Sequence, residues 1–374
     1  DQDLHVSVDF GGDVLYQNNG DGSFTDVSAA AGIGPPQHGM GLYTGDLNND
    51  GCPDLVSSNN SRTNTDDPET DELGPSIIYL NNCDGTFTIG SYASGTRDRG
   101  VVNWGVNLID YDNDGDLDFS EVSGAMLTGG EPNAFYENDG SGFLFDITAA
   151  NALGNEGDAF GSAWIDMDKD GDLDWFVSNA SNVLNTSRVY RNDSTTGHYL
   201  KVKLNGAGKN VDAVGAVVKI TAGSRTQMRT IQAGVSYANS EELVAHFGVG
   251  VKQIVDNVTV MWPTGGTTEL TAVAVDQTLV IDEEISEPEP LPGSISGMVT
   301  DPTGLPVNGA IIDIRDLATN QLVTLARSDT NGNYSVADLA AGDYRVAALK
   351  SGFLPSRVHR FSIVSGDELV IDLQ

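Results

Sequence analysis

Three stretches of the chain repeat one acidic pattern whose spacing suits metal binding. Each reads Asp-x-(Asp/Asn)-x-Asp-Gly-x-x-Asp, at residues 46–54, 110–118 and 166–174. Ca²⁺ takes about six to eight oxygen ligands, and carboxylates at alternate positions of a tight loop can point towards one centre. The glycine at position six permits the sharp turn that such a loop needs. The pattern therefore predicts about three full calcium sites.

The residues on both sides of each loop favour strands over helices. β-branched and aromatic residues dominate these flanks, and no helical period is present. An EF-hand needs flanking helices and a glutamate at its twelfth position, where the loops have Ser57, Glu121 and Val177. A metal-free acidic turn is the other alternative, but three copies of clustered carboxylates would repel themselves without a cation. We expect metal-binding loops that each join two antiparallel strands.

The composition is strongly acidic. The 374 residues include 54 Asp and Glu against 19 Lys and Arg, which gives a formal net charge of −35. Nucleic acids and anionic membranes attract basic patches, and no apolar run reaches the ~18 residues of a membrane span. We therefore expect no nucleic-acid partner and no membrane insertion. Calcium loops of this kind suit the millimolar calcium outside cells, so an extracellular location, secreted or at the cell surface, is predicted.

The two cysteines are placed so that they could form a disulfide. Cys52 lies at the end of the first acidic loop, before a predicted strand at about 54–59, and Cys83 follows a predicted strand at about 76–81. If these strands pair antiparallel, the two sulfurs become neighbours. A disulfide would fit an oxidising compartment. Two buried free thiols are the alternative.

Each acidic loop belongs to a longer repeating unit. Asn-rich hairpins close the units at 15–27, 78–87, 135–143 and 189–193, and an Asp-Gly pair between apolar residues favours a hairpin turn. Four antiparallel strands that recur along a chain are typical of propeller blades. The opening Asp1-Gln-Asp3-Leu aligns with residues 116–119, which predicts that the chain begins inside a repeat.

These units resemble FG-GAP/VCBS repeats, the integrin-like β-propeller unit, and residues 160–174 are close to that family's consensus. In such repeats the loop between the first two strands of a blade binds Ca²⁺. The resemblance implies ligation by the side chains at positions one, three, five and nine and by the backbone carbonyl of position seven. The implied ligands are Asp46, Asn48, Asp50, Cys52 and Asp54; Asp110, Asp112, Asp114, Asp116 and Asp118; Asp166, Asp168, Asp170, Asp172 and Asp174; and Asp1 and Asp3 in the partial copy.

The rest of the chain resembles two further β-rich modules. Residues 198–282 carry several motifs in the order of an ASPIC/UnbV domain, which follows FG-GAP repeats in the cartilage acidic protein family. An acidic, proline-rich linker spans 283–293. Residues 294–374 resemble the carboxypeptidase-regulatory-like, transthyretin-like β-sandwich. We therefore predict an all-β protein with propeller blades over 1–197, followed by these two modules.

The sequence offers little evidence of catalysis. It has no G-x-S-x-G, H-E-x-x-H or P-loop motif. His246 has no companion ligand nearby in sequence and is expected to pack in the interior. Trp104 and Trp164 stand at equivalent positions before two of the loops, so a core role is expected rather than a platform for sugars.

Two functions fit these observations. The first is adhesion or binding, with calcium as a structural ion and with an unknown protein or carbohydrate as ligand. The second is an extracellular enzyme, such as a polysaccharide lyase or hydrolase, whose active residues lie in variable loops or in further blades. For that alternative the loops are 60–75, 123–132 and 180–187, and the basic pair to watch is Arg97 and Arg99.

Overall fold

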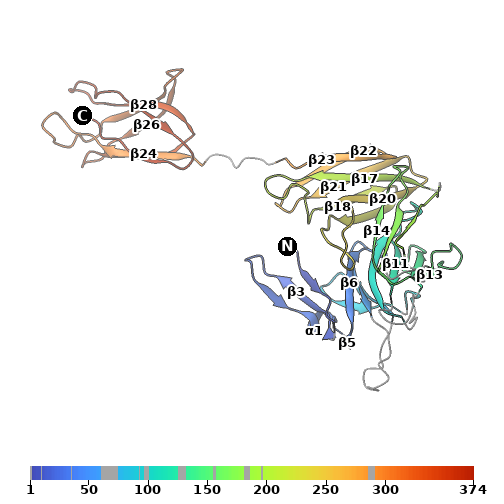
Figure 1. Cartoon of the computed structure of the whole chain (residues 1–374). Helices are drawn as coiled ribbons and strands as arrows, with labels where there is room; N and C mark the ends of the chain where they lie inside the picture. Colours follow the sequence, from blue (N-terminus) through green and yellow to red (C-terminus); the bar gives the residue numbers. More distant parts are fainter. Residues whose placement is uncertain are drawn as a thin grey trace. The chain divides into compact units, whose positions relative to one another are not determined.

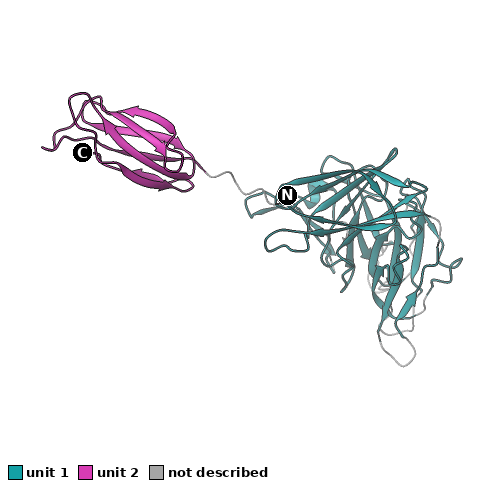
Figure 2. Cartoon of the chain, turned by 90° about the horizontal axis from the view of Figure 1, so that it is seen from above, with its two compact units in different colours: residues 1–284 teal, residues 285–374 magenta. Residues whose placement is uncertain are grey.

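The computed structural model confirms an all-β chain. It describes residues 2–9, 11–34, 36–59, 75–91, 93–96, 101–124, 132–154, 157–180, 186–194, 197–284 and 291–374. Among these, one short helix, α1 (Ser28–Ala31), accompanies the strands. The chain divides into two compact units, residues 1–284 and residues 285–374 (Figures 1 and 2).

Four antiparallel sheets, which we call the first to fourth blades, make up the N-terminal part of unit 1, and each pairs its strands in chain order. The first blade has β1 (Leu4–Val6), β3 (Val14–Asn18) and β4 (Phe24–Asp26). The short strands β2 (Gly11–Gly12) and β5 (Pro36–Gln37) pair with each other in a separate two-stranded sheet. The second blade has β6 (Gly39–Gly45), β7 (Asp54–Asn59), β8 (Ile77–Asn81) and β9 (Phe87–Ile89). The third has β10 (Asn103–Ile109), β11 (Asp118–Ser123), β12 (Ala134–Asn138) and β13 (Leu144–Asp146). The fourth has β14 (Ala159–Ile165), β15 (Asp174–Asn179) and β16 (Arg188–Tyr190).

Each acidic loop joins the first two full-length strands of a blade, as predicted. The loops connect β6 to β7, β10 to β11 and β14 to β15. The third blade is covered on both sides, since β10 packs against both β6 and β14. All residues of β10 and β11 are consequently buried. Trp104 and Trp164 are 8% and 6% exposed and donate their indole N–H groups within the protein, so both are core residues as expected.

A two-sheet module completes unit 1 and lies against the blades (Figure 1). One sheet has the order β20-β17-β23 and the other β19-β18-β21-β22. The strands are β17 (His198–Asn205), β18 (Val217–Ala222), β19 (Arg225–Thr230), β20 (Val244–Gly250), β21 (Ile254–Met261), β22 (Thr267–Ala274) and β23 (Gln277–Asp282). Leu200, Phe247 and Val258 pack in the core between the two sheets. We call residues 198–284 the central module.

Unit 2 is a separate β-sandwich with its own core. Its sheets have the orders β27-β24-β30 and β26-β25-β28-β29. The strands are β24 (Gly293–Met298), β25 (Ile311–Asp316), β26 (Leu322–Arg327), β27 (Asn333–Leu339), β28 (Gly342–Leu349), β29 (His359–Ile363) and β30 (Glu368–Val370). Ile312, Val346 and Leu373 are fully buried between the sheets. The sandwich predicted for this part of the chain is confirmed.

Candidate metal centres

The three acidic loops share one backbone conformation. Position four of each loop is left-handed, with φ of 57° at Asn49, 61° at Asn113 and 66° at Lys169. The glycine at position six also has positive φ, between 90° and 99° in the three loops. Glycine adopts such angles without strain and asparagine more readily than most residues, which explains glycine at position six and asparagine at position four of two loops; Lys169 is the exception. The turn brings carboxylates at positions one, three and nine together in the second loop and those at positions one, three and five together in the third.

The aspartate at position nine is the buried anchor of each loop. Asp118 is 1% exposed, and its two carboxylate oxygens accept the backbone N–H groups of Tyr111 at 3.1 Å and Asn138 at 2.9 Å. Asp54 and Asp174 accept the equivalent pairs of N–H groups at 2.8–2.9 Å. These contacts lock the end of the loop to the hairpin that closes the same blade.

Sequence reasoning missed the hairpin asparagines that make this connection. Asn81, Asn138 and Asn192 each donate the backbone N–H just described and use the side-chain amide to bind a carbonyl of an acidic loop. Their signal in the sequence is an asparagine that recurs two residues after the tyrosine of each third strand. Asn18 repeats the contact with Asp3 at 2.8 Å, which confirms that Asp3 aligns with position nine. Asp1 lies outside the described residues.

The aspartate at position one carries an unsatisfied oxygen in the second and third loops. Asp110 and Asp166 are 2% and 8% exposed, and Oδ1 of each has no hydrogen-bond partner among the described residues. A buried carboxylate oxygen without a partner costs free energy, and a bound cation would remove that cost. In the second loop, carboxylate oxygens of Asp110, Asp112 and Asp118 lie within 4.8 Å of one another. Asp166, Asp168 and Asp170 form the corresponding group in the third loop.

The raised pKa values of the aspartates in the second loop also indicate a cation site. The pKa of Asp110 is raised to about 7, chiefly by burial, which outweighs the opposing effect of Arg229, and with smaller contributions from the charges of Asp114 and Asp112. The pKa of Asp118 is raised well above its ordinary value by burial and by Asp110. Burial, with help from Asp112 and Asp116, also raises the pKa of Asp114 to about 6. Crowded, dehydrated carboxylates of this kind favour either protonation or a cation.

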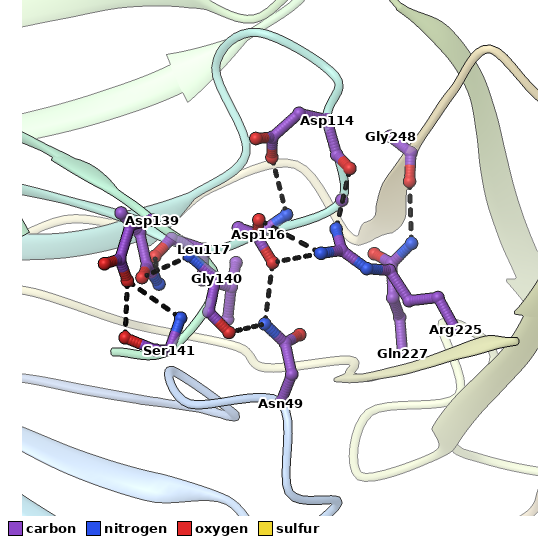
Figure 3. A network of polar contacts seen from close by, with 12 residues as sticks. Asn49, Asp114, Asp116, Leu117, Asp139, Gly140, Ser141, Arg225, Gln227 and Gly248 are labelled. Carbon is purple, nitrogen blue, oxygen red and sulfur yellow. Dashed lines mark hydrogen bonds and ion pairs between the residues drawn. The ribbon is translucent and has the colours of Figure 1, made fainter. Parts of the chain in front are cut away.

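Position seven turns its side chain away from the loop. The carboxylate of Asp116 pairs with Arg225 at 2.9 Å and accepts the side-chain amide of Asn49 at 2.7 Å (Figure 3). Asp172 accepts the side-chain amide of Asn113 at 2.8 Å in the same way. The side-chain amide at position four of one loop therefore binds the carboxylate at position seven of the next loop. With these side chains engaged elsewhere, the backbone carbonyl is the group that position seven can offer to a metal ion.

The first loop is built differently. Both oxygens of Asp46 accept backbone N–H groups, from Asp50 at 3.0 Å and Gly51 at 2.9 Å, and the amide of Asn48 donates to Asp50 at 3.0 Å. Position seven is Cys52, which forms a disulfide with Cys83 across a Cα–Cα distance of 5.7 Å. The predicted disulfide is confirmed. The two sulfurs lie near Asp50, but a disulfide offers no thiolate, so they add no metal ligand.

The central module clamps the second and third loops. Backbone N–H groups of Gly248 and Gly250 donate to Asp110 and to the carbonyl of Asn113, both at 2.8 Å. Arg225 donates to the carbonyl of Asp114 at 2.7 Å (Figure 3). Lys201 lies 3.3 Å from Asp166 in the third loop. The sequence gives no local signal for these contacts, because the partners are far apart along the chain.

His246 is part of this clamp. Its Nε2 lies 2.7 Å from the side-chain oxygen of Asn113. Burial, with smaller effects of Lys201 and Arg229, lowers the pKa of His246 to about 3. The imidazole is therefore neutral and packs as an interior residue, as expected from the sequence. The loops named for an enzymatic alternative lie mostly outside the described residues, as do Arg97 and Arg99.

Family models match three segments of the chain. An FG-GAP-like repeat matches residues 1–57, ASPIC and UnbV matches residues 206–288, and a carboxypeptidase regulatory-like domain matches residues 294–374. Among the described residues, no helix is long and apolar enough to cross a membrane.

Among curated proteins, the chain is similar to cartilage acidic protein 1 of Homo sapiens, with 29% identity over 269 residues. The same protein of Mus musculus is 28% identical over 269 residues, and that of Xenopus tropicalis is 28% identical over 273 residues. These matches cover 70% of this chain but only 39–40% of each relative.

Likeness to solved structures is weak. (S)-allantoin synthase is 18% identical, covers 22% of this chain and 42% of its own, and has a TM-score of 0.18. The Bacillus anthracis TIE protein is 10% identical, covers 98% of this chain and 69% of its own, and has a TM-score of 0.24. The family matches, together with the blades and modules that they cover, show that the chain combines FG-GAP-like repeats, an ASPIC/UnbV domain and a carboxypeptidase regulatory-like domain, and that it is related to cartilage acidic protein 1.

Proposed function

We propose that this protein is an extracellular binding protein whose blades are stabilised by Ca²⁺ at the three acidic loops. The observation that carries the proposal is the pair of unsatisfied, buried oxygens at Asp110 Oδ1 and Asp166 Oδ1, each beside further carboxylates. A divalent cation neutralises such a cluster and takes oxygen ligands from an irregular loop, which Ca²⁺ accepts more readily than Mg²⁺. The ligands are the side chains at positions one, three, five and nine and the carbonyl at position seven.

Calcium has a structural role in this proposal. Each loop joins two strands, and its position-nine aspartate already binds backbone groups from two parts of the blade. An ion at the loop would fix the remaining carboxylates in the same place. The disulfide between Cys52 and Cys83 and the excess of acidic residues support a location outside the cell, where disulfides persist and calcium is abundant.

Thermal unfolding tests the calcium proposal. In excess chelator the melting temperature is expected to fall by many degrees, and Ca²⁺ is expected to restore it better than Mg²⁺. A ligand at a hundred times its Kd stabilises a protein by about 2.7 kcal/mol per site. An unchanged melting curve in chelator would contradict the proposal.

A matched pair of variants assigns the sites. Asp168→Ala removes a position-three carboxylate from the third loop, and calorimetric titration should show the calcium stoichiometry drop by about one. Asp139→Ala removes an exposed aspartate that binds Ser141 in a hairpin turn outside the loops, and the stoichiometry should not change. Equal loss in both variants would show that the ions bind elsewhere.

The ligand of the binding protein is proposed to be a protein or a carbohydrate. The strong acidity disfavours a nucleic acid or an anionic membrane as partner. A glycan array probed in Ca²⁺ and again in chelator tests the carbohydrate alternative. Binding that requires calcium supports the blades as the recognition surface, whereas an array without binding favours a protein ligand.

A further inference from the structure

The outer face of one sheet in unit 2 carries a row of arginines. In the sheet that contains β26 and β28 (Figure 1), Arg315 of β25 is directly opposite Arg345 of β28, which is directly opposite Arg360 of β29. Ile314 and Val346, next to the first two arginines in sequence, are fully buried in the core of the sandwich. Because side chains alternate along a strand, the arginines point away from that core. Like charges directly opposite each other destabilise a sheet, so the row is a cost to the fold of unit 2.

The row is neutralised at one end only. Arg315 pairs with Asp313 on its own strand, with Nε 2.9 Å from the carboxylate. Asp343 also faces outward, but its carboxylate accepts the hydroxyl of Ser362 at 2.6 Å. Within the described part of the chain, the guanidinium groups of Arg345 and Arg360 have neither an ion pair nor a hydrogen bond. Two guanidinium groups on neighbouring strands are therefore available to an anionic partner.

The sequence concentrates positive charge around this row. Residues 344–366 contain three arginines and one lysine but no aspartate or glutamate, although the whole chain has a formal net charge of −35. These residues form most of β28, all of β29 and the connection between them. At physiological ionic strength, exposed charges more than about 8 Å apart are largely screened from each other. The acidic remainder of the chain therefore does not cancel this local excess of positive charge.

Apolar side chains flank the arginines on the same face. Leu325 of β26 is 54% exposed and Leu349 of β28 is 36% exposed. The register places them on the outer face together with Ile311 and Ala347. Arginine beside exposed apolar surface is typical of protein–protein interfaces, whereas a polyanion such as a nucleic acid is bound chiefly by basic groups. The composition of this face therefore favours a polypeptide as the anionic partner.

We propose that this surface, which we call the arginine face, binds an acidic segment of a partner polypeptide. The arginine face consists of the outward side chains of Arg315, Arg345, Arg360, Leu325 and Leu349. Carboxylates of the segment pair with Arg345 and Arg360, whose forked guanidinium groups can each bind a carboxylate through two hydrogen bonds. Apolar side chains of the same segment pack on Leu325 and Leu349. The segment removes the repulsion between opposed arginines, which gives the row a use that its cost to the fold otherwise lacks.

The arginine face is independent of the proposed calcium sites. It lies wholly in unit 2, whereas the acidic loops lie in unit 1. An acidic segment should therefore bind in chelator as well as in Ca²⁺. An anionic membrane fits the face less well, because its apolar residues lie in the plane of a sheet and would not reach the acyl region of a bilayer.

The test uses the full chain and a labelled synthetic peptide, Gly-Asp-Leu-Asp-Asp-Leu-Asp-Gly. Fluorescence anisotropy in chelator, at a temperature where the protein is folded, should show saturable binding. A matched peptide with asparagine in place of every aspartate should bind about tenfold more weakly, because its hydrogen bonds to the guanidinium groups are no longer charge-assisted. Raising the salt concentration from about 0.05 M to about 0.5 M should weaken binding of the acidic peptide by a similar factor. Equal binding of the two peptides, or no binding of either, would overturn the proposal.

Variants of the protein separate the arginine face from non-specific attraction. Arg345→Gln and Arg360→Gln should each weaken binding about fivefold, and neither should lower the melting temperature, because each relieves a like-charge pair. Leu325→Ala should weaken binding about threefold through lost apolar contact. Arg191→Gln removes an exposed arginine that pairs with Asp193 in unit 1, and it should leave binding unchanged. Lost binding together with a lower melting temperature in the first two variants would show that the arginines serve the fold instead.

Two further measurements distinguish the other occupants. Heparin or vesicles of anionic phospholipid that bind the parent but not Arg360→Gln, when the acidic peptide fails to bind, would assign the face to a polysaccharide or a membrane. Sedimentation of the protein without peptide should show the same species for the parent and for Arg360→Gln. A dimer that Arg360→Gln dissociates would show that a second copy of this chain occupies the face, and would overturn the proposal.

Discussion

The first and second acidic loops have the same pattern and the same turn, yet they are stabilised by different means. The first is self-contained, since the oxygens of Asp46 are satisfied within the loop and Cys52 is covalently tied to the next hairpin. The second depends on the central module, which contacts Asp110, Asn113 and Asp116 through β19 and β20. The same sequence pattern thus gives a first loop that is stabilised within its own blade and a second loop that is stabilised by the central module.

This difference shows that the repeated loop sequence determines the backbone conformation of the loop but not the electrostatic environment of its carboxylates. In the second loop, burial raises the pKa of Asp110 to about 7, while Arg229 and Gly248 of the central module oppose the rise. The pKa of Asp46 is also raised, chiefly by burial, and backbone N–H groups of Gly51 and Asp50 within its own loop oppose that rise. We therefore expect the second loop to respond most strongly to changes in the module, and the first to changes in its disulfide.

Removal of the disulfide should have the largest effect. The Cys52→Ser, Cys83→Ser double variant opens a loop with a sequence separation of 31, and the chain-entropy relation predicts a loss of about 3–4 kcal/mol. Hydrogen exchange should rise in residues 46–54 and much less in residues 110–118. An equal rise in both loops would show that the first loop is not maintained independently.

The pH dependence of the free energy of unfolding should report on Glu241, which joins the central module to the blades. Glu241 accepts hydrogen bonds from Tyr43 of β6 at 2.6 Å and Asn107 of β10 at 2.7 Å, and burial raises its pKa to about 7. Between pH 4.5 and 7 the folded state holds a proton that the unfolded state releases, so stability falls as pH rises through this window. Glu241→Gln removes this loss and should gain about 1–3 kcal/mol at pH 8 but little at pH 4.5.

Chemical denaturation of both proteins in chelator at the two pH values checks this expectation. Differences between the variant and the parent at each pH cancel the titration of the acidic loops. A gain of the same size at both pH values would mean that the charge of Glu241 is not what matters.

Loss of Arg225 should weaken the second loop directly. Arg225→Ala removes the ion pair with Asp116 and the hydrogen bond to the carbonyl of Asp114, for an expected cost of about 2 kcal/mol. Arg225→Lys should recover part of this because it keeps the charge but not the forked geometry. Arg327→Ala, at an exposed site in unit 2, is the matched control. An Arg225→Ala protein as stable as the control would remove the proposed dependence on the module.

The smallest expected effect compares the asparagines at position four. Asn49→Ala and Asn113→Ala both place alanine at positive φ, of 57° and 61°, so the backbone cost is shared. Asn113 contacts His246 as well as Asp172. Asn113→Ala should therefore be less stable than Asn49→Ala by about 1 kcal/mol, as measured by denaturant unfolding. The reverse order would contradict the comparison between the two loops.

Much of the fold could be predicted from the sequence because its signals are local. The acidic spacing located the three turns, the alternating apolar residues located the strands beside them, and antiparallel pairing of β7 with β8 brought Cys52 and Cys83 together. Contacts between neighbouring blades, and contacts between the central module and the blades, could not be predicted in this way. Arg225 and Lys201 look like ordinary strand residues until β19 and β17 are packed against the loops.

The sequence by itself determined which carboxylates share a loop, since a nine-residue turn sets their spacing without help from the rest of the chain. Only the tertiary structure decided which of those carboxylates are buried, which have an unsatisfied oxygen and which are neutralised by a side chain. Arg225 reaches Asp116 across 109 residues, whereas the donors of Asp46 come from within its own loop. Charge compensation depends on distances in space, and those are set by packing between the blades and the central module.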